Sequence, residues 1–309
     1  MKRFTSLAAA SALLFTVAAC AGSGSSSSTT TAPGAASTTT NVSTTTSAVS
    51  ADAPKAIISL SPTGTEMLFA IGAGSQVIAV DDQSNFPAEA LQKPHKLSGF
   101  EPNVEAIAAM KPDLVVMSDS KVKDQLTSLG IKVWIGSAPD DFKGVYDQIE
   151  QLGAATGHVA DAAGVVSKMQ TDIAAAVNGV TASATPLRVY HELDPTFYSV
   201  TSKTFIGAVY SLFGMNNIAD GAQPGNDYPQ LNAEYIVKAN PDLVVLADSK
   251  CCSANATSVA ARPGWSAVNA VAHQGLVLVD DDVASRWGPR LVDFVKVVAA
   301  AAAKVPVGA

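Results

Sequence analysis

One segment of nineteen residues occurs twice in this chain of 309 residues. Residues 103–121 read NVEAIAAMKPDLVVMSDSK and residues 232–250 read NAEYIVKANPDLVVLADSK, with 11 of 19 positions identical. In each copy a helical pattern leads through Pro-Asp into a buried Leu-Val-Val strand. Because the copies start 129 residues apart, the chain is predicted to form two similar α/β lobes, not one large domain or a many-copy solenoid.

A second repeat supports the two lobes. Residues 60–74 and 202–214 each predict a turn and then a helix that a glycine closes, Gly72 in the first copy and Gly214 in the second. A short predicted β segment follows each copy, at 76–80 and at 216–220. Each lobe is therefore predicted to have the element order strand, helix, strand, helix, strand. This order implies mainly parallel sheets covered by helices.

The segment between the two lobes is nearly all helix-forming. It runs from Phe142 to Val180, and its last part, from His158, predicts one long Ala-rich helix. We interpret this helix as a rigid connector that permits only small movements of the lobes, with a ligand cleft between them. The predicted boundaries are an N-terminal lobe at 54–145, a connecting helix at 146–180 and a C-terminal lobe at 186–305.

The N-terminus has the pattern of an export signal. Lys2 and Arg3 precede an apolar run that ends in small residues at Ala19, and Cys20 follows. This pattern resembles the lipobox of bacterial lipoproteins, in which the cysteine becomes the lipid-modified N-terminus. Residues 1–19 are thus predicted to be a signal peptide, and the Ser/Thr-rich segment 20–53 a disordered tether. The expected location is extracytoplasmic, with a lipid anchor on the outer face of the cell membrane.

The charge of the chain excludes one class of partner. With Lys2 and Arg3 removed, 18 basic residues face 27 acidic ones, and a chain this acidic is a poor binder of nucleic acid. No segment after the signal offers eighteen uncharged apolar residues, so no transmembrane helix is expected. We expect a monomer.

Cys251 and Cys252 are adjacent in sequence. Consecutive Cα atoms across a trans peptide lie about 3.8 Å apart, below the usual range of disulfides at about 4.4–6.8 Å. A disulfide between them is therefore expected only with a distorted or cis peptide. Two free thiols and an intermolecular bridge remain open as alternatives.

Signal, tether, two β/α lobes and a helical connector together resemble the class III substrate-binding proteins of ABC importers, the family that carries vitamin B12, ferric siderophores or haem. The resemblance covers the chain from Lys55 onward. Its most specific pieces are Ile58–Pro62, the two Pro-Asp-Leu-Val-Val strands, Tyr228–Gln230, Arg262–Trp265 and Ser285–Arg290.

The resemblance assigns a role to two repeated acids. Glu105 and Glu234 occupy matching positions in the first turn of matching helices. Read locally, each stabilises its helix N-terminus next to an Asn cap. In the family, one surface Glu from each lobe docks on a subunit of the permease dimer, which works with ATPase subunits. The implied partners are such a permease, a small-molecule ligand and, through the lipid, the membrane.

The candidate ligand residues come from strand-to-helix turns at the facing edges of the sheets. By resemblance to the B12-binding members, Tyr228 packs against the ligand, while Asp282 and Arg286 provide polar contacts. Other aromatic positions of that relative align with non-aromatic residues here, and nearby rings are candidate substitutes. The remaining candidates, several of them equally compatible with a core role, are Gln83, Phe86, Phe100, His191, Glu192 and Trp287. The expected ligand is a cobalt corrinoid or, as the alternative, a ferric siderophore or haem, with no intrinsic cofactor.

Three rival functions were weighed. A zinc or manganese receptor needs several converging His, whereas this chain has four scattered ones, so no bare metal site is expected. A serine hydrolase of the α/β type needs G-x-S-x-G, which is absent, and no P-loop or dinucleotide motif occurs. The chain is therefore expected not to be an enzyme. A non-transport lipoprotein that scaffolds other envelope proteins stays open, because one fold hosts unrelated functions.

Overall fold

The structure, a computed structural model, describes residues 52–181, 183 and 185–305. By its internal contacts the chain divides into units 1–45 and 46–309, and every described residue belongs to the second. The predicted signal peptide, Cys20 and nearly all of the predicted tether lie outside the described residues. Within the described part, no helix is both long and apolar enough to cross a bilayer.

The first lobe is built on a four-stranded parallel sheet. Its strands follow the order β2-β1-β3-β4, with β1 paired to both β2 and β3. Both β1 and β3 are buried along their whole length, as expected for a parallel sheet with helices on both faces. The strands are β1 Ile57–Leu60, β2 Val77–Val80, β3 Leu114–Met117 and β4 Lys132–Ile135.

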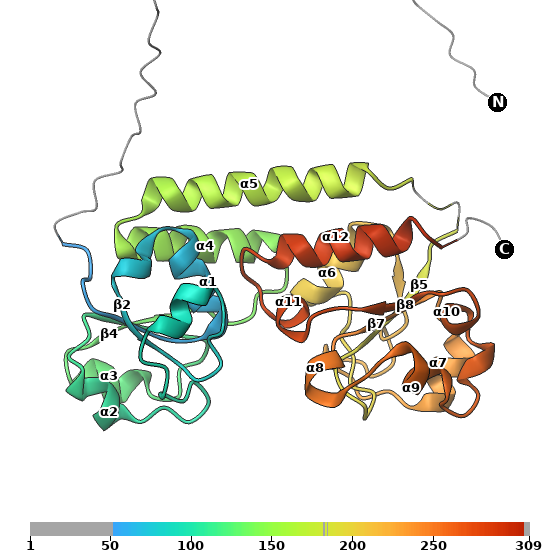
Figure 1. Cartoon of the computed structure of the whole chain (residues 1–309), viewed down its shortest axis with the longest axis horizontal. Coiled ribbons are helices and arrows are strands. Elements are labelled where there is room, and N and C mark those ends of the chain that lie inside the picture. Colours follow the sequence, from blue (N-terminus) through green and yellow to red (C-terminus); the bar gives the residue numbers. More distant parts are fainter. Residues whose placement is uncertain (1–51, 182, 184, 306–309) are drawn as a thin grey trace, which may run out of the picture. The chain divides into compact units, whose positions relative to one another are not determined.

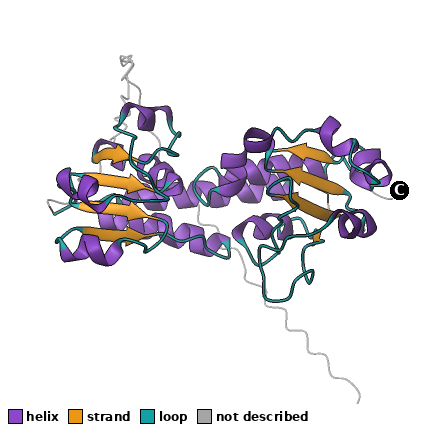
Figure 2. Cartoon of the chain, turned by 90° about the horizontal axis from the view of Figure 1, so that it is seen from below, coloured by secondary structure: helices purple, strands orange, loops and turns teal. Residues whose placement is uncertain are grey.

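The second lobe repeats this plan. Its sheet has the order β6-β5-β7-β8, and all its pairs are parallel. Figure 2 shows the two groups of strands, each with helices beside it. The predicted α/β class with two mainly parallel sheets is confirmed. The strands are β5 Arg188–Glu192, β6 Asn216–Asn217, β7 Leu243–Leu246 and β8 Leu276–Leu278.

The sequence repeats correspond to equivalent elements. Helix α2 (Val104–Ala109) is capped by Asn103, whose side chain accepts a hydrogen bond from the amide of Ala106. Helix α7 (Ala233–Ala239) is capped in the same way by Asn232, through the amide of Tyr235. Both caps satisfy an otherwise unpaired N–H at the start of the helix. The two copies therefore have the same local structure as well as the same sequence.

Glycines also end two equivalent helices. Gly72 follows helix α1 (Pro62–Ala70) at φ 83°, and Gly214 follows helix α6 (Phe205–Ser211) at φ 64°. A residue with a Cβ atom is strained in this left-handed conformation, which explains why both copies of the second repeat close on glycine.

Two long helices lie between the lobes in sequence. Helix α4 (Phe142–Thr156) ends at Gly157, and helix α5 (Val159–Asn178) packs against α4 and against the C-terminal helix α12 (Leu291–Ala302) (Figure 1). Since α4 also contacts α1 and α12 also contacts α6, α5 is joined to both lobes. The shorter helices are α3 Lys123–Ser128, α8 Ser249–Cys252, α9 Ala256–Ala260, α10 Asn269–Ala272 and α11 Asp281–Ser285.

Candidate functional site

The segments after the outer strands of the two sheets interact at two places, through hydrogen bonds at one and through charge at the other. After β2 and β8, Asn85 donates to Asp282 at 2.9 Å, and Arg286 donates to the carbonyl of Gln83 at 3.1 Å. After β4 and β6, the charge of Asp140 acts on Tyr228. The loops after the central strands β1, β3, β5 and β7 therefore lie between these two contacts. We call all the loops that follow the carboxyl ends of the strands the interlobe face.

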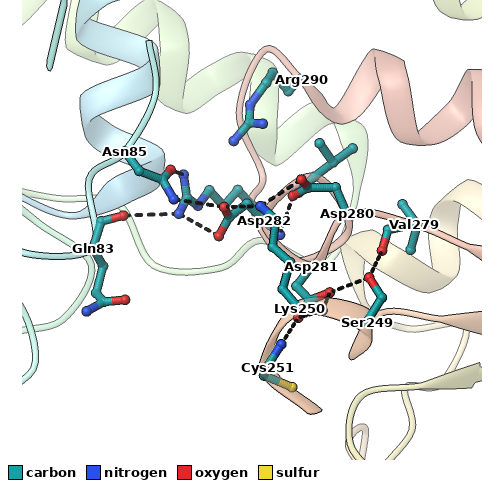
Figure 3. A network of polar contacts seen from close by, with 12 residues as sticks. Gln83, Asn85, Ser249, Lys250, Cys251, Val279, Asp280, Asp281, Asp282 and Arg290 are labelled. Atoms are coloured by element: carbon teal, nitrogen blue, oxygen red, sulfur yellow. Dashed lines mark hydrogen bonds and ion pairs between the residues drawn. The ribbon is translucent and has the colours of Figure 1, made fainter. Parts of the chain in front are cut away.

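A buried ion cluster joins the lobes at the first contact. Glu66 in α1 is bound by Arg286 at 2.8 Å and by the Nε of Arg290 at 2.9 Å, and its side chain is only 1% exposed. Arg286 also donates to Asn85 at 2.8 Å and to Asp282 at 2.7 Å. Figure 3 shows the part of this network around Asn85, Asp282 and Arg290. We name the five residues Glu66, Asn85, Asp282, Arg286 and Arg290 the interlobe clasp.

The clasp changes the interpretation of two predicted ligand residues. Arg286 is 7% exposed, and its guanidinium donates hydrogen bonds to four acceptors. It therefore has no free pair of N–H groups with which to bind a ligand. Burial alone would raise the pKa of Asp282, but hydrogen bonds from Asn85 and Lys250 and the charge of Arg286 hold that pKa below its usual range. In this structure both side chains serve the contact between the lobes. Sequence reasoning missed Glu66, although an acid inside an otherwise uncharged helix was a signal.

The exposed aromatic side chains of the interlobe face come from both lobes. Tyr228 is 42% exposed, and burial of its other side, followed by the charges of Asp140 and Asp227, raises its pKa. Phe100 is 77% exposed, with the ammonium of Lys121 4.2 Å from its ring centre. A further exposed ring, Tyr198 after β5, was not singled out from the sequence.

Three other candidates have mixed surroundings. Gln83 has an exposed side chain beside the clasp. Phe86 is half-exposed, and the guanidinium of Arg290 lies 4.3 Å from its ring centre. Trp287 is partly buried, and its indole N–H donates to Gln148 of α4 at 3.0 Å. Trp287 therefore links the C-terminal lobe to α4.

Two candidates lie inside the C-terminal lobe, away from any surface. His191 is fully buried, contacts the hydroxyl of Tyr210 at 2.6 Å, and has its pKa lowered to about 3 by burial. Glu192 is also fully buried, and its two carboxylate oxygens accept hydrogen bonds from the guanidinium of Arg262 at 2.6 and 2.7 Å. Contrary to the expectation from sequence, neither side chain reaches the interlobe face, because elements from distant parts of the chain cover the end of β5.

One buried acid lies directly at the end of β7. Asp248 is fully buried, and neither of its carboxylate oxygens has a hydrogen-bond partner among the described residues. Burial, and then the charge of Glu192, raise its pKa to about 7. Its counterpart in the first copy of the repeat, Asp119, is 40% exposed and bonded to Lys121.

Cys251 and Cys252 are joined by a disulfide in the exposed helix α8. Their Cα atoms are 3.8 Å apart, the distance of a trans peptide, so of the two linkages expected from the sequence the cis one is excluded. The amides of Lys250 and Cys251 donate to Asp281, which ties α8 to the loop after β8 (Figure 3).

The repeated acids occupy equivalent, exposed sites. Glu105 and Glu234 each lie one residue after the first residue of their helix, α2 or α7, next to the Asn cap. Both side chains are exposed. The capping geometry supports the local interpretation and leaves both carboxylates accessible.

Cavities and metal-ligand groups add little to this picture. A cavity of about 1080 Å³ lies at the opposite, amino ends of β3 and β4, with Leu114 and Lys132 in its wall. A smaller one of about 360 Å³ adjoins the clasp at Phe86 and Arg290. Across the described ranges, no group of three or more His, Cys, Asp or Glu is arranged to hold a metal ion.

Comparison with known proteins identifies the family that shares this architecture. The family model described as periplasmic binding protein matches residues 57–283. The chain belongs to this family. An uncharacterized ABC transporter substrate-binding lipoprotein of Bacillus subtilis is 33% identical over 257 residues, which are 79% of this chain and 78% of that protein. A cobalamin-binding protein of Halobacterium salinarum is 30% identical over 80% of this chain and 69% of its own length.

Solved structures share the fold. A periplasmic haem-binding protein from Roseiflexus sp. RS-1, in its apo form, superposes with a TM-score of 0.72 at 20% identity, covering 81% of this chain and 98% of that one. At this identity the likeness shows the fold alone. Two parallel α/β lobes whose carboxyl ends face one another are thus the shared architecture of a binding protein, and the ligand has to be argued from the residues at that face.

Proposed function

We propose that this protein is the substrate-binding receptor of an ABC importer and that its ligand is a corrinoid bound at the interlobe face. The observation that carries the proposal is the set of exposed rings, Tyr198 and Tyr228 from one lobe and Phe100 from the other, on loops that follow the carboxyl ends of the strands in both lobes. Aromatic faces suit a large planar macrocycle. The cobalamin-binding relative from Halobacterium supports this choice of ligand.

The proposed role is binding and delivery without bond chemistry. The relatives are substrate-binding proteins of transporters, and the nucleotide is hydrolysed by the ATPase subunits of the importer. Cys20 would carry the lipid anchor, and residues 20–53 would hold the two lobes near the membrane. The helix α5, packed against helices of both lobes, would keep their spacing nearly constant while the ligand enters and leaves.

Titration of the unit 46–309 with cyanocobalamin, followed by calorimetry, tests the ligand. We expect a dissociation constant below about 1 μM, or about −8 kcal/mol.

Replacing Tyr228 with alanine should weaken binding about tenfold, because the ring loses its stacking contact. Replacing Tyr235, a partly exposed tyrosine of α7 whose hydroxyl donates to the carbonyl of Ile218, with phenylalanine should leave binding unchanged. If cyanocobalamin gives no heat but haem or a ferric siderophore binds, the corrinoid assignment is wrong and the receptor role stands. If no ligand of these classes binds, the scaffold alternative is favoured.

Docking on the permease is tested separately. Replacing Glu105 and Glu234 together with alanine should lower ligand uptake by cells at least tenfold, because each lobe loses the exposed charge proposed to meet the permease. Ligand affinity of the purified variant should not change, since both residues are in α2 and α7 rather than on the interlobe face. Replacing the exposed acids Asp124 and Glu150 instead should leave uptake as in the wild type, and uptake unaffected by the first pair would refute this docking role.

A further inference from the structure

The net charge of this protein is concentrated on the interlobe face. The loops after the strands, with helices α8 and α11, carry 14 of the acidic and 7 of the basic residues, while the rest of the chain carries 13 of each. The whole excess of negative charge, −7 for the full chain, is therefore on the side where the lobes meet. These loops are residues 81–103, 118–122, 136–141, 193–204, 218–232, 247–252 and 279–290.

Four of the seven basic side chains are already neutralised within the face. Arg286 and Arg290 are bound by Glu66, and Arg286 also by Asp282. Lys250 lies 2.7 Å from Asp280 and 2.9 Å from Asp282. To bind one of these four cations, a ligand carboxylate would have to displace its present partner, and each displacement exposes a buried or shared charge.

The fourth neutralised base, Lys121, lies beside the exposed ring of Phe100. Its ammonium donates to the Phe100 carbonyl at 3.0 Å and pairs with Asp119 at 3.5 Å. On the other lobe, burial and then the charges of Asp140 and Asp227 raise the pKa of the Tyr228 hydroxyl. Carboxylates thus lie in the surroundings of two of the three proposed rings, Asp119 through its pair with Lys121 at Phe100, and Asp140 with Asp227 at Tyr228.

A buried group adds an independent observation. Asp248 ends β7 in the middle of the face, is fully buried and finds no hydrogen-bond partner for either oxygen among the described residues. This end of the central strand therefore holds acceptor oxygens that are unsatisfied within the described structure.

We propose that the interlobe face selects its ligand by charge, accepting neutral or cationic corrinoids whose amide arms donate N–H to carboxylates, and rejecting analogues that carry carboxylate arms. This inference rests on the proposed corrinoid-binding function and adds the charge class of the ligand. Carboxylates accept hydrogen bonds from amides. They repel an anion by about 0.5 kcal/mol for each unscreened charge some 8 Å away in water, and by more where water is excluded.

A matched ligand pair tests this. Cyanocobalamin is compared with the derivative in which one peripheral amide is hydrolysed to a carboxylate, using the unit 46–309 at about 20 mM and then about 500 mM salt. The carboxylate should bind at least fivefold more weakly at low salt, and the difference should shrink below about twofold at high salt, because salt screens the face. A derivative with an amine on the same arm should bind more tightly than cyanocobalamin at low salt.

A pair of variants checks that the selection comes from the face. Replacing Asp140 with asparagine should reduce the penalty for the carboxylate derivative about twofold, whereas replacing Asp124 in α3 with asparagine should not change it. If the corrinoids bind and the carboxylate derivative is as tight as cyanocobalamin, the charge selection is wrong and the proposed function stands. If haem, which carries two carboxylates, binds and no corrinoid does, the charge selection and the corrinoid assignment are both wrong, and only the receptor role stands.

Discussion

Replacing Glu66 with alanine is expected to lower the free energy of unfolding by about 3–5 kcal/mol. The substitution removes the only carboxylate that both Arg286 and Arg290 contact in the described structure, and it leaves two guanidinium groups in a site where the Glu66 side chain is 1% exposed. Arg290 is the more dependent of the two, because the hydrogen bond to Glu66 is the main cause that raises its pKa. Urea denaturation of wild type and variant, monitored by circular dichroism, gives the difference.

Two further variants separate the charge from the packing. Glu66→Gln keeps the volume and an acceptor oxygen but loses the charge, so it should fall between wild type and Glu66→Ala. Asp172→Ala breaks the exposed pair with Lys168 and should cost no more than about 1 kcal/mol. If Glu66→Ala costs as little as this surface control, the clasp does not hold the lobes together, and Arg286 would again be available as a ligand residue.

The sequence was informative where the structure depends on local pattern. The spacing of 129 residues between the two Asn-x-Glu…Pro-Asp-Leu-Val-Val copies predicted equivalent helices and central strands, and α2 with β3 and α7 with β7 confirm this. The helix expected from His158 is α5, for which His158 is the N-terminal flanking residue. The resemblance also singled out Arg262–Trp265, and Trp265 is fully buried and contacts the buried Tyr190 edge to face.

The site was less predictable because its contacts join residues far apart in sequence. Glu66 and Arg286 are separated by 220 positions, and no local pattern indicates that an acid in the first helix meets the last turn of the second lobe. The burial of Glu192 depends on Arg262, which approaches from a distant loop. The resemblance to ligand-contacting residues therefore pointed to residues at or beside the interlobe face. The residues to which these side chains are bonded, such as Glu66 and Arg262, could be identified only from the structure.

Asp248→Asn is expected to stabilise the protein at pH 8 by about 2–4 kcal/mol and to have a much smaller effect at pH 4. The pKa of Asp248 is raised from 3.8 to about 7 by burial and then by the charge of Glu192. For an acid whose pKa is higher in the folded state, the contribution to stability is complete below the unfolded pKa and is lost as the pH rises from about 4 to about 7. Asparagine has the same shape and does not ionise in this pH range, so the variant should not show this decrease in stability.

The free energy of unfolding of both proteins, measured at pH 4, 6 and 8, tests the argument. Asp119→Asn is the matched control, since Asp119 has the same place in the first copy of the repeat but is 40% exposed and bonded to Lys121, and it should leave the pH dependence of the wild type unchanged. An Asp248→Asn profile parallel to the wild type would mean that Asp248 stays ionised in the folded protein. Arg262 would then have to balance Glu192 and Asp248 together, and the C-terminal lobe would carry an uncompensated negative charge beneath its binding face.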